Sequence, residues 1–289
     1  MSSWLIAIDG GGSTCRAALA GPDGEIVSRA LAGPANVATD PQQAAANIVA
    51  AAQGALAEAG LPAGALSACP ALLGLAGARQ LGRDGRSLLS LPFSQVELVG
   101  DGEIALEGAL GPHDGIMAIL GTGSAFLARQ DGEIRSVGGW GVHLADQGGG
   151  ARLGREALKS ALLSRDGVRP RGRLAEMLLA AFGDDPARMV AFAGSARQAD
   201  FARHAPAVFA AAKAGDSEAE ALLAAFTKEV EEMLSALLWP GCRRIVPMGG
   251  LAPLYAPRLA PHLAALLAEP RGDALDGAVR MARRAFFAA

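Results

Sequence analysis

The sequence predicts an α/β protein built from two similar lobes with a cleft between them, the second lobe being larger and rich in helices. Two observations support this fold class. Apolar runs of strand length alternate with helical patterns over the first hundred residues. A layout of strand, glycine-rich turn, strand, Asp-Gly turn and strand then occurs again roughly 110 residues further on, which indicates an internal duplication. The length of 289 residues is sufficient for one large or two modest domains.

The composition excludes two broad classes of protein. Hydrophobic residues make up 51% of the chain and charged residues 19%, and the formal net charge is -3. Intrinsic disorder requires lower hydrophobicity and a higher net charge. A nucleic-acid-binding protein that depends on phosphate contacts requires a basic excess, which this chain lacks. We therefore expect a globular protein without a nucleic-acid partner.

Cysteine usage and hydropathy bear on the compartment. Cys15, Cys69 and Cys242 lie far apart and form no CxxC pair or disulfide framework, which favours a reducing, cytoplasmic location. The first residues do not have the pattern of a signal peptide. Residues 59–78 are uncharged over a membrane-spanning length. Their prolines and glycines instead favour a loop followed by a buried strand, so we expect no membrane partner.

The first lobe alternates predicted strands and helices. Its strands are expected at residues 4–8, 16–20, 25–30, 71–75 and 96–99. The hairpin turn at residues 21–24 joins the second strand to the third. Asp40 and Pro41 begin a helix that is expected to end at a C-cap near Gly60, and another helix is expected near residues 80–90.

The second lobe repeats the strand layout and then becomes helical. Its strands are expected at residues 115–120, 125–129, 133–137 and 243–248. Its helices are expected at residues 151–164, 173–182 and 216–239, the last with an apolar stripe of Leu222, Phe226, Val230, Met233 and Leu237. We assign residues 1–112 to the first lobe and 113–273 to the second, with a terminal helix over 274–289 joined to the first.

Three glycine-rich turns each follow an apolar strand directly. They are Asp9-Gly10-Gly11-Gly12-Ser13-Thr14, Gly121-Thr122-Gly123-Ser124 and Gly249-Gly250-Leu251. Glycine lets backbone N–H groups approach an anion closely, so together the turns indicate a phosphate cradle. Each turn taken alone is more often a plain tight turn. Asp9 is placed to hold Mg²⁺ through water. The chain has no Walker A lysine, GxGxxG turn or zinc-ligand spacing.

Asp101 follows an apolar strand and precedes a predicted helix. Ligands of open α/β sheets bind at the carboxyl ends of the strands. A carboxylate in that place is suited to accept the proton of a hydroxyl during phosphoryl transfer. Aspartate is also a favoured helix N-cap, and position alone does not separate the two roles.

Two further loops carry side chains suited to a sugar. Trp140 stands between glycines, so it either lines a pocket or plugs a hinge. Asp146 and Gln147 offer paired acceptors and donors for vicinal hydroxyls. Asn36 is another loop amide able to bind a hydroxyl, and otherwise is a turn residue.

Taken in order, these motifs resemble those of the sugar kinase, Hsp70 and actin-like ATPase superfamily. The chain is similar to its BadF/BadG/BcrA/BcrD branch, which contains N-acetylglucosamine kinases, bacterial glucosamine kinases and reductase-activating ATPases. The resemblance rests on the segments at residues 8–14, 74–77, 101, 119–124, 246–251 and 273–278. It implies two ribonuclease H-like lobes, the use of ATP and Mg²⁺, and a homodimer for which no interface can be identified in the sequence.

The resemblance also implies roles for individual residues. Asp101 is expected to be the catalytic base that deprotonates the sugar 6-hydroxyl. The sugar-binding positions are expected to be Asn36, Asp101, Thr122, Gly139, Trp140, Asp146 and Gln147. The ATP-binding positions are expected to be Gly11, Gly12, Ser13, Thr14, Gly121, Thr122, Gly123, Gly249 and Gly250, with Asp9 at the Mg²⁺.

One departure from the family pattern bears on the substrate. The broad family usually has Gly-Asp-Glu-Gly-Ser where this chain has Ala-Asp-Gln-Gly-Gly at residues 145–149. The Asp-Gln-Gly form is similar to bacterial glucosamine kinases, so the resemblance implies transfer of phosphate from ATP to the 6-hydroxyl of glucosamine. N-acetylglucosamine is the alternative substrate. The alternative functions are a reductase-activating ATPase with a cysteine-bound iron–sulfur cluster and a non-catalytic sensor or repressor.

Overall fold

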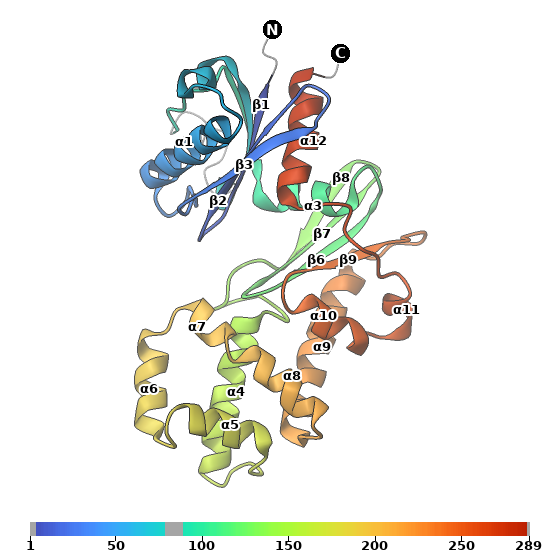
Figure 1. The fold of residues 1–289 in the computed structure, drawn as a ribbon. Coiled ribbons are helices and arrows are strands. Elements are labelled where there is room, and N and C mark those ends of the chain that lie inside the picture. Colours follow the sequence, from blue (N-terminus) through green and yellow to red (C-terminus); the bar gives the residue numbers. More distant parts are fainter. Residues whose placement is uncertain (1–3, 79–88, 288–289) are drawn as a thin grey trace. The chain divides into compact units, whose positions relative to one another are not determined.

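The computed structural model describes residues 4–78 and 89–287. The chain divides into two compact units, the first made of Met1–His113 with Pro270–Ala289 and the second of Asp114–Glu269 (Figure 1). Residues 270–273 belong to unit 1, although the sequence had grouped them with the second lobe. The reason is a local pairing: the backbone N–H of Arg271 donates to the carbonyl oxygen of Ala109 at 3.1 Å.

Unit 1 contains a five-stranded sheet in the order β3-β2-β1-β4-β5. Its strands are β1 (Leu5–Gly10), β2 (Cys15–Ala20), β3 (Ile26–Ala32), β4 (Pro70–Leu75) and β5 (Gln95–Gly100). The first three form an antiparallel meander, β4 pairs with β1 in parallel, and β5 pairs with β4 in parallel. Its helices are α1 (Pro41–Glu58), η1 (Ala63–Ala68), α3 (Asp101–Leu110) and α12 (Ala274–Phe287).

The alternation of side chains along β1 assigns its two faces to two cores. Ile6 and Ile8 belong to the cluster that also contains the buried face of α1, whereas Leu5 and Ala7 pack with the buried face of α12. Asp9 continues the series of Leu5 and Ala7. Its side chain therefore leaves the sheet on the face that α12 covers.

Helix α1 begins as the sequence predicts, because the Asp40 carboxylate accepts a hydrogen bond from the backbone N–H of Gln43. Its C-cap is Ala59 rather than Gly60. Gly60 is the following residue, and its φ of 72° is the left-handed conformation that commonly ends a helix. The uncharged residues 59–78 contain the fully buried β4 that was predicted, preceded by the short 3-10 helix η1 where a loop was expected. The helix expected near 80–90 falls mainly on residues 79–88, outside the described residues.

Helices α3 and α12 cross at unusually short range. A Cβ atom at Gly277 would lie 2.0 Å from the carbonyl oxygen of Ile104 and 2.5 Å from the backbone nitrogen of Gly108. A Cβ atom at Gly108 would lie 2.0 Å from the carbonyl oxygen of Asp273. Only glycine at both positions lets the two backbones touch. The Glu107 carboxylate, almost fully buried, adds an ion pair with Arg284 at 2.7 Å.

Unit 2 contains a four-stranded sheet in the order β8-β7-β6-β9. Its strands are β6 (Gly115–Leu120), β7 (Ser124–Gln130), β8 (Glu133–Val137) and β9 (Ile245–Met248). Strands β6, β7 and β8 form an antiparallel meander, and β9 adds to β6 in parallel. This is the same arrangement as β1, β2, β3 and β4, so the layout that the sequence repeats is also repeated in the pairing of the strands.

The helices of unit 2 pack with its sheet into one core. They are α4 (Gly150–Arg165), α5 (Arg173–Ala181), α6 (Pro186–Ser195), α7 (Gln198–Ala202), α8 (Ala205–Lys213), α9 (Ser217–Leu237), α10 (Ala252–Tyr255), η3 (Ala256–Arg258) and α11 (Pro261–Ala264). Helices α4, α5 and α9 were expected from the sequence, whereas α6, α7 and α8 were not. Helix α6 has a single buried residue, Met189, so it carries little apolar periodicity.

Helix α9 shows how packing refines a sequence pattern. The predicted stripe is correct at Phe226, Val230 and Leu237, which are buried, but Leu223 and Leu234 are buried in place of Leu222 and Met233. In both of these pairs two apolar residues are adjacent in the sequence, so periodicity alone could not choose between them. Asp216 caps this helix through Ala219 and caps α5 through Leu174, both with backbone N–H to carboxylate distances of 2.9 Å.

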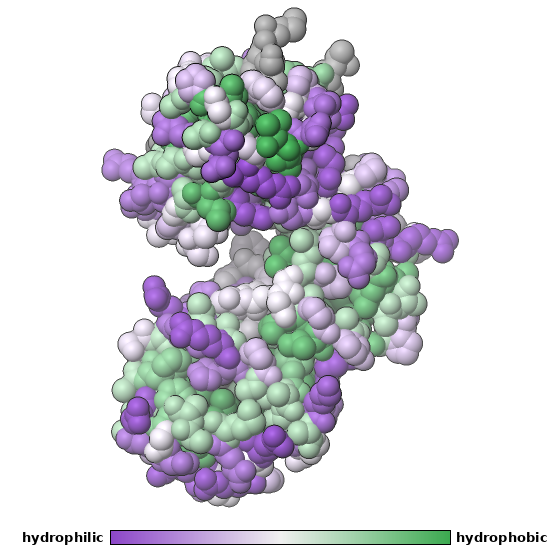
Figure 2. All heavy atoms as spheres, viewed as in Figure 1, coloured by the Kyte–Doolittle hydropathy of each residue, from purple (hydrophilic) through white to green (hydrophobic). Residues whose placement is uncertain are grey.

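Figure 2 shows hydrophilic residues spread over the visible faces of both units, as expected when most apolar side chains are used in the cores. No helix among residues 4–78 and 89–287 is both long and apolar enough to cross a membrane.

The crossing of α3 and α12 yields a test of the fold. We expect Gly277→Ala to lower the free energy of unfolding by about 1–3 kcal/mol or more, because the added methyl overlaps the α3 backbone. Gly194→Ala on α6 is the matched control: a Cβ atom there meets no neighbour within 4 Å, and helix propensity predicts a gain of about 0.5–1 kcal/mol. Urea unfolding of both variants measures the effects, and a similar change in the two would contradict the close crossing.

Candidate functional site

The glycine-rich turn of unit 1 is held by backbone hydrogen bonds. The N–H of Gly11 donates to the carbonyl of Thr14 at 2.9 Å, and the carbonyl of Gly11 accepts from the N–H of Ala35 at 2.9 Å. The carbonyl of Gly10 accepts from the N–H of Ala76, directly after β4, at 2.8 Å. Gly12, Ser13 and Thr14 remain exposed. The loop is therefore fixed at its base, while its tip presents N–H groups and hydroxyls to solvent.

Asn36 lies beside this turn. Its side-chain oxygen accepts hydrogen bonds from the backbone N–H groups of Ala38 at 3.0 Å and Thr39 at 3.3 Å. The structure therefore gives Asn36 the turn-forming role that the sequence left open. The side-chain oxygen is used in the turn. The side-chain amide nitrogen donates no hydrogen bond to a described residue and is left for a ligand.

Asp101 is exposed at the carboxyl end of β5, as the first residue of α3. The helix N-cap is Gly100, whose N–H donates to the Glu103 carboxylate at 3.2 Å. Among the described residues, the Asp101 carboxylate accepts a hydrogen bond only from the N–H of Gly102, at 2.9 Å from Oδ1. Asp101 therefore does not cap the helix, and its side chain is available for chemistry.

Asp9 is paired with Arg16, its cross-strand partner on β2. Two guanidinium nitrogens, Nε and Nη2, donate to the same carboxylate oxygen Oδ2, at 2.8 and 2.6 Å. Burial raises the pKa of Asp9, Arg16 opposes this rise, and the nearby charge of Asp101 adds to it. The two predicted carboxylates of unit 1 are thus close enough to influence each other.

The glycine-rich turn of unit 2 is also held by backbone hydrogen bonds. The carbonyls of Gly121 and Thr122 accept from the first N–H groups of α4, Gly150 and Ala151, each at 2.8 Å. The N–H of Leu251 donates to the carbonyl of Leu120 at 2.9 Å. The turn after β6, the start of α4 and the turn after β9 therefore form one backbone-bonded cluster.

Gly249 and Gly250 occupy different environments in that cluster. Gly249 has a φ of 91°, and a Cβ atom there would lie 2.5 Å from the carbonyl oxygen of Leu120. Gly250 has open space on its side-chain face. Gly249 is required for the close approach of β9 to β6, whereas Gly250 leaves room for a bound group.

Asp146 is the side chain around which this region is ordered. It is nearly fully buried and has a φ of 61°, a left-handed conformation that is uncommon outside glycine. Burial raises the pKa of its carboxyl group, while the hydrogen bond from the backbone N–H of Ser124 and the charge of Arg152 act to lower it. Its carboxylate therefore holds the start of β7, next to the glycine turn.

The side chain of Trp140 is exposed to solvent, whereas that of Gln147 is directed into unit 2. Trp140 is 80% exposed, so it is not a core residue of unit 2. The side chain of Gln147 turns inward, and its Oε1 lies 3.4 Å from the position of a Cβ atom on Gly138. Gly139 has a φ of 71° and open space on its side-chain face. Within the described chain, Gln147 Oε1 and Ser124 Oγ are buried without a hydrogen-bond partner.

Sequence reasoning missed Arg16, whose third contact is to Asp273 at 2.7 Å. The sequence did contain a signal for the pairing of Arg16 with Asp9, since a hairpin across residues 11–14 places the two residues opposite each other. No local signal could have indicated Asp273, because it reaches β2 only through the return of α12.

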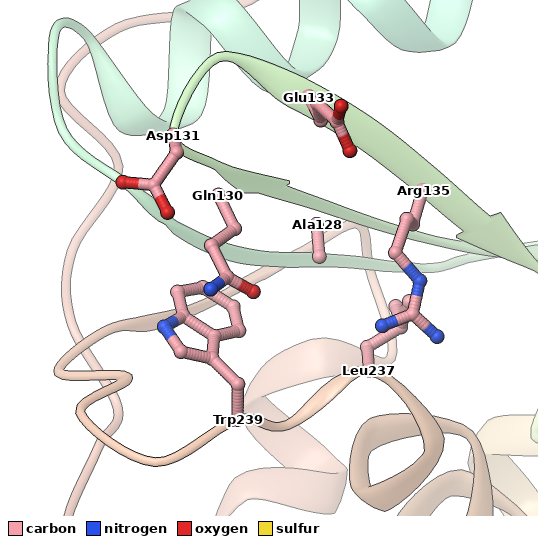
Figure 3. A pocket seen from close by; sticks show the side chains of 7 residues that line it. All are labelled: Ala128, Gln130, Asp131, Glu133, Arg135, Leu237 and Trp239. Atoms are coloured by element: carbon pink, nitrogen blue, oxygen red, sulfur yellow. The ribbon is translucent and has the colours of Figure 1, made fainter.

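A separate cavity of about 350 Å³ lies on unit 2, lined by Ala128, Gln130, Asp131, Glu133, Arg135, Leu237 and Trp239. Figure 3 shows Gln130, Arg135 and Trp239 around it, from β7, β8 and the segment after α9. None of the predicted site residues lines it, and it brings no acid, base or glycine turn of the candidate site together.

The donor set of Asp9 fits an ion such as Mg²⁺. Arg16 occupies Oδ2, and no described residue donates to Oδ1, which is left for a hydrated cation. No cluster of three or more His, Cys, Asp or Glu able to hold a metal occurs among the described residues. Mg²⁺ keeps several waters and takes few protein carboxylates, so the one open oxygen of Asp9 fits it.

Residues 6–258 match the BadF/BadG/BcrA/BcrD ATPase family, and the chain belongs to this family. It is 32% identical over 281 residues to the glucosamine kinase GspK of Vibrio cholerae, covering 97% of this chain and 96% of that protein. It is 31% identical over 172 residues to the N-acetylmuramic acid/N-acetylglucosamine kinase of Clostridium acetobutylicum, covering 56% and 55% of the two chains.

Among solved structures, the chain is similar to a Chromobacterium violaceum protein provisionally named as an N-acetylglucosamine kinase. The TM-score is 0.88 at 33% identity, over 97% of this chain and 99% of the other. The predicted α/β fold of the actin-like ATPase and sugar kinase superfamily is thereby confirmed.

The packing of Asp146 against the glycine turn yields a second test. A Cβ atom at Gly123 would lie 2.6 Å from Oδ2 of Asp146, whereas one at Gly121 would meet nothing within 4 Å. We expect Gly123→Ala to lower the free energy of unfolding by about 1–3 kcal/mol through overpacking. Gly121→Ala should stay within about 0.5 kcal/mol. Equal losses by chemical denaturation would show that Asp146 does not control the turn.

Proposed function

We propose that this chain is an ATP-dependent kinase that transfers phosphate to the 6-hydroxyl of glucosamine. The observation that carries the proposal is the placement of Asp101, exposed at the carboxyl end of β5 and free of the helix-capping role. Its position suits a general base, and the glycine turns after β1, β6 and β9 supply backbone donors suited to phosphate. Family membership and similarity to sugar kinases support the same activity.

In the proposed reaction, the Asp101 carboxylate accepts the proton of the sugar 6-hydroxyl as that oxygen attacks the γ-phosphorus. The new O–P bond forms while the bond to the β,γ-bridging oxygen breaks, and ADP leaves. Gly11, Gly12, Ser13, Thr14, Gly121, Thr122 and Gly123 are proposed to contact the phosphates, and Gly249 and Gly250 the adenosine. Mg²⁺, when held near Asp9, supplies charge neutralisation at the phosphates.

The sugar is proposed to contact Asn36, Thr122, Gly139, Trp140 and Asp146. Asn36 offers its amide nitrogen, and Trp140 an exposed ring of the kind that packs on sugar faces. The side chain of Gln147 points inward, which favours a role in ordering the loop of Asp146. A direct contact between Gln147 and the sugar is not favoured in this conformation. The resemblance further supports a homodimer and a cytoplasmic location as proposals.

N-acetylglucosamine is the second candidate substrate, favoured by the name of the Chromobacterium violaceum protein. The iron–sulfur alternative is weakened by the cysteines. All three are free thiols buried within the described chain, far apart in the sequence, so none of them is presented at the surface as a cluster ligand.

The substrate is tested by ADP release with Mg²⁺-ATP, comparing glucosamine, N-acetylglucosamine and glucose. A preference in kcat/KM of about tenfold, or about 1.4 kcal/mol, for glucosamine is expected. The same preference for N-acetylglucosamine would show that N-acetylglucosamine, and not glucosamine, is the substrate. Folded protein that binds ATP without sugar-dependent turnover, or that shows iron–sulfur absorption, would contradict the kinase proposal.

The role of Asp101 is tested by Asp101→Asn. We expect kcat to fall by about 10²–10⁴-fold, because the variant cannot accept the proton, while the Kd for ATP changes little. Asp166→Asn, which removes an exposed carboxylate paired with Arg165, is the matched control and should retain wild-type kcat. A kcat for Asp101→Asn within a few-fold of wild type would rule out the base role.

A further inference from the structure

Arg16 connects Asp9 to the C-terminal helix through three directed contacts. Its Nε and Nη2 groups both bind Oδ2 of Asp9, at 2.8 and 2.6 Å. Its Nη1 group binds Oδ2 of Asp273 at 2.7 Å. The planar guanidinium is therefore bound along two edges, which leaves it little freedom to rotate.

Asp273 is itself held at the start of α12. Its Oδ1 accepts from the N–H of Asp276 at 2.9 Å, and its own N–H donates to Oδ2 of Asp276 at 2.9 Å. Each side-chain oxygen of Asp273 thus has a separate task, one in capping the helix and one in binding Arg16. The position of Arg16 is determined by an element that lies 257 residues away in the chain.

The pairing also controls which oxygen of Asp9 is available. The Asp9 side chain is only 18% exposed, so an unpaired charge there would be costly. Because Arg16 takes Oδ2 twice, the charge is compensated while Oδ1 receives no hydrogen bond from a described residue. A cation at Oδ1 would lie in a region where Asp101 adds further negative charge.

We propose that Arg16 is a positioning residue that holds Asp9 with Oδ1 presented to the hydrated Mg²⁺ of the bound nucleotide, and that Asp273 holds Arg16 in place. The inference rests on the proposed use of Mg²⁺-ATP. Arg16 acts through Asp9 and does not itself contact substrate. It would make the C-terminal helix a part of the metal-binding arrangement, although α12 lies at the opposite end of the chain from the β1 turn.

The test measures ADP binding by calorimetry with Mg²⁺ and with EDTA. We expect Arg16→Gln to weaken Mg²⁺-ADP binding about 10–100-fold, the range seen when partners of a metal ligand are removed. Binding of ADP in EDTA should remain within about twofold, because the glycine turn is intact. Arg16→Lys should be intermediate, since one ammonium cannot supply all three contacts.

Arg29→Gln is the matched control. Arg29 also pairs with the start of α12, with Asp276 at 2.8 Å and with Asp273 at 3.9 Å. The short bond from Arg16 to Asp273 is kept in this variant, so the Mg²⁺ dependence of its ADP binding should stay within about twofold of wild type. If Arg16→Gln does not fold, Asp273→Asn decides. This variant keeps a side-chain oxygen for the cap of α12 but weakens the bond to Arg16 and the ion pair with Arg29, and a selective loss of Mg²⁺-ADP affinity is expected.

The inference is overturned if the folded variants bind Mg²⁺-ADP as tightly as wild type, or lose affinity equally with and without Mg²⁺. It is also overturned if Mg²⁺ does not strengthen ADP binding to the wild type. A wild-type protein that binds Mg²⁺-ADP but phosphorylates no sugar would instead contradict the proposed function alone.

Discussion

The close crossing of α3 and α12 at Gly108 and Gly277 is the contact on which unit 1 depends. Because neither residue has a side chain, the C-terminal helix can rest on the backbone of the helix that Asp101 begins. The same contact brings Asp273 to the edge of the sheet, where it meets Arg16. Asp101 and Asp9, the two carboxylates proposed for the chemistry, therefore both depend on this helix packing: Asp101 begins α3, and Asp9 is held by Arg16. A methyl group at the crossing would disturb both.

Unit 2 uses backbone contacts to similar effect. The turn after β6 is bonded to the start of α4 and to the turn after β9 through main-chain groups, and glycine is what lets these segments approach so closely. Such loops are precise because their donors are held by the backbone rather than by long side chains. They also explain why the region is dense in glycine yet contains few titratable groups, with Asp146 as the buried exception.

The electrostatics of the candidate site follow from this construction. The glycine turns offer N–H dipoles and hydroxyls, and none of them carries a lysine or arginine. In the proposed reaction, backbone dipoles compensate the charge of a triphosphate only in part, and the proposed Mg²⁺ would supply further compensation. In unit 1, Asp9, Asp101 and Asp273 provide negative charge beside Arg16, which neutralises and orders the carboxylates it touches.

Features that depend on neighbouring residues could be predicted from the sequence. Alternating apolar runs, the capping residue Asp40 and the Asp-Gly hairpin turns predicted the strands, the start of α1 and the repeated meander, because each of these is decided within a few positions along the chain. Asp101 could be placed at the end of a strand for the same reason. The sequence could not show that Glu103, rather than Asp101, satisfies the start of α3, since both residue types suit that place.

Features that join distant segments could be identified only in the folded chain. The choice of Leu223 over Leu222 on α9, the inward turn of Gln147 and the link from Asp9 through Arg16 to Asp273 each depend on which surface packs opposite. Local propensity and periodicity carry no information about a partner more than two hundred residues away. Packing and charge compensation in the folded chain supply that information, because they act between residues that only the fold brings together.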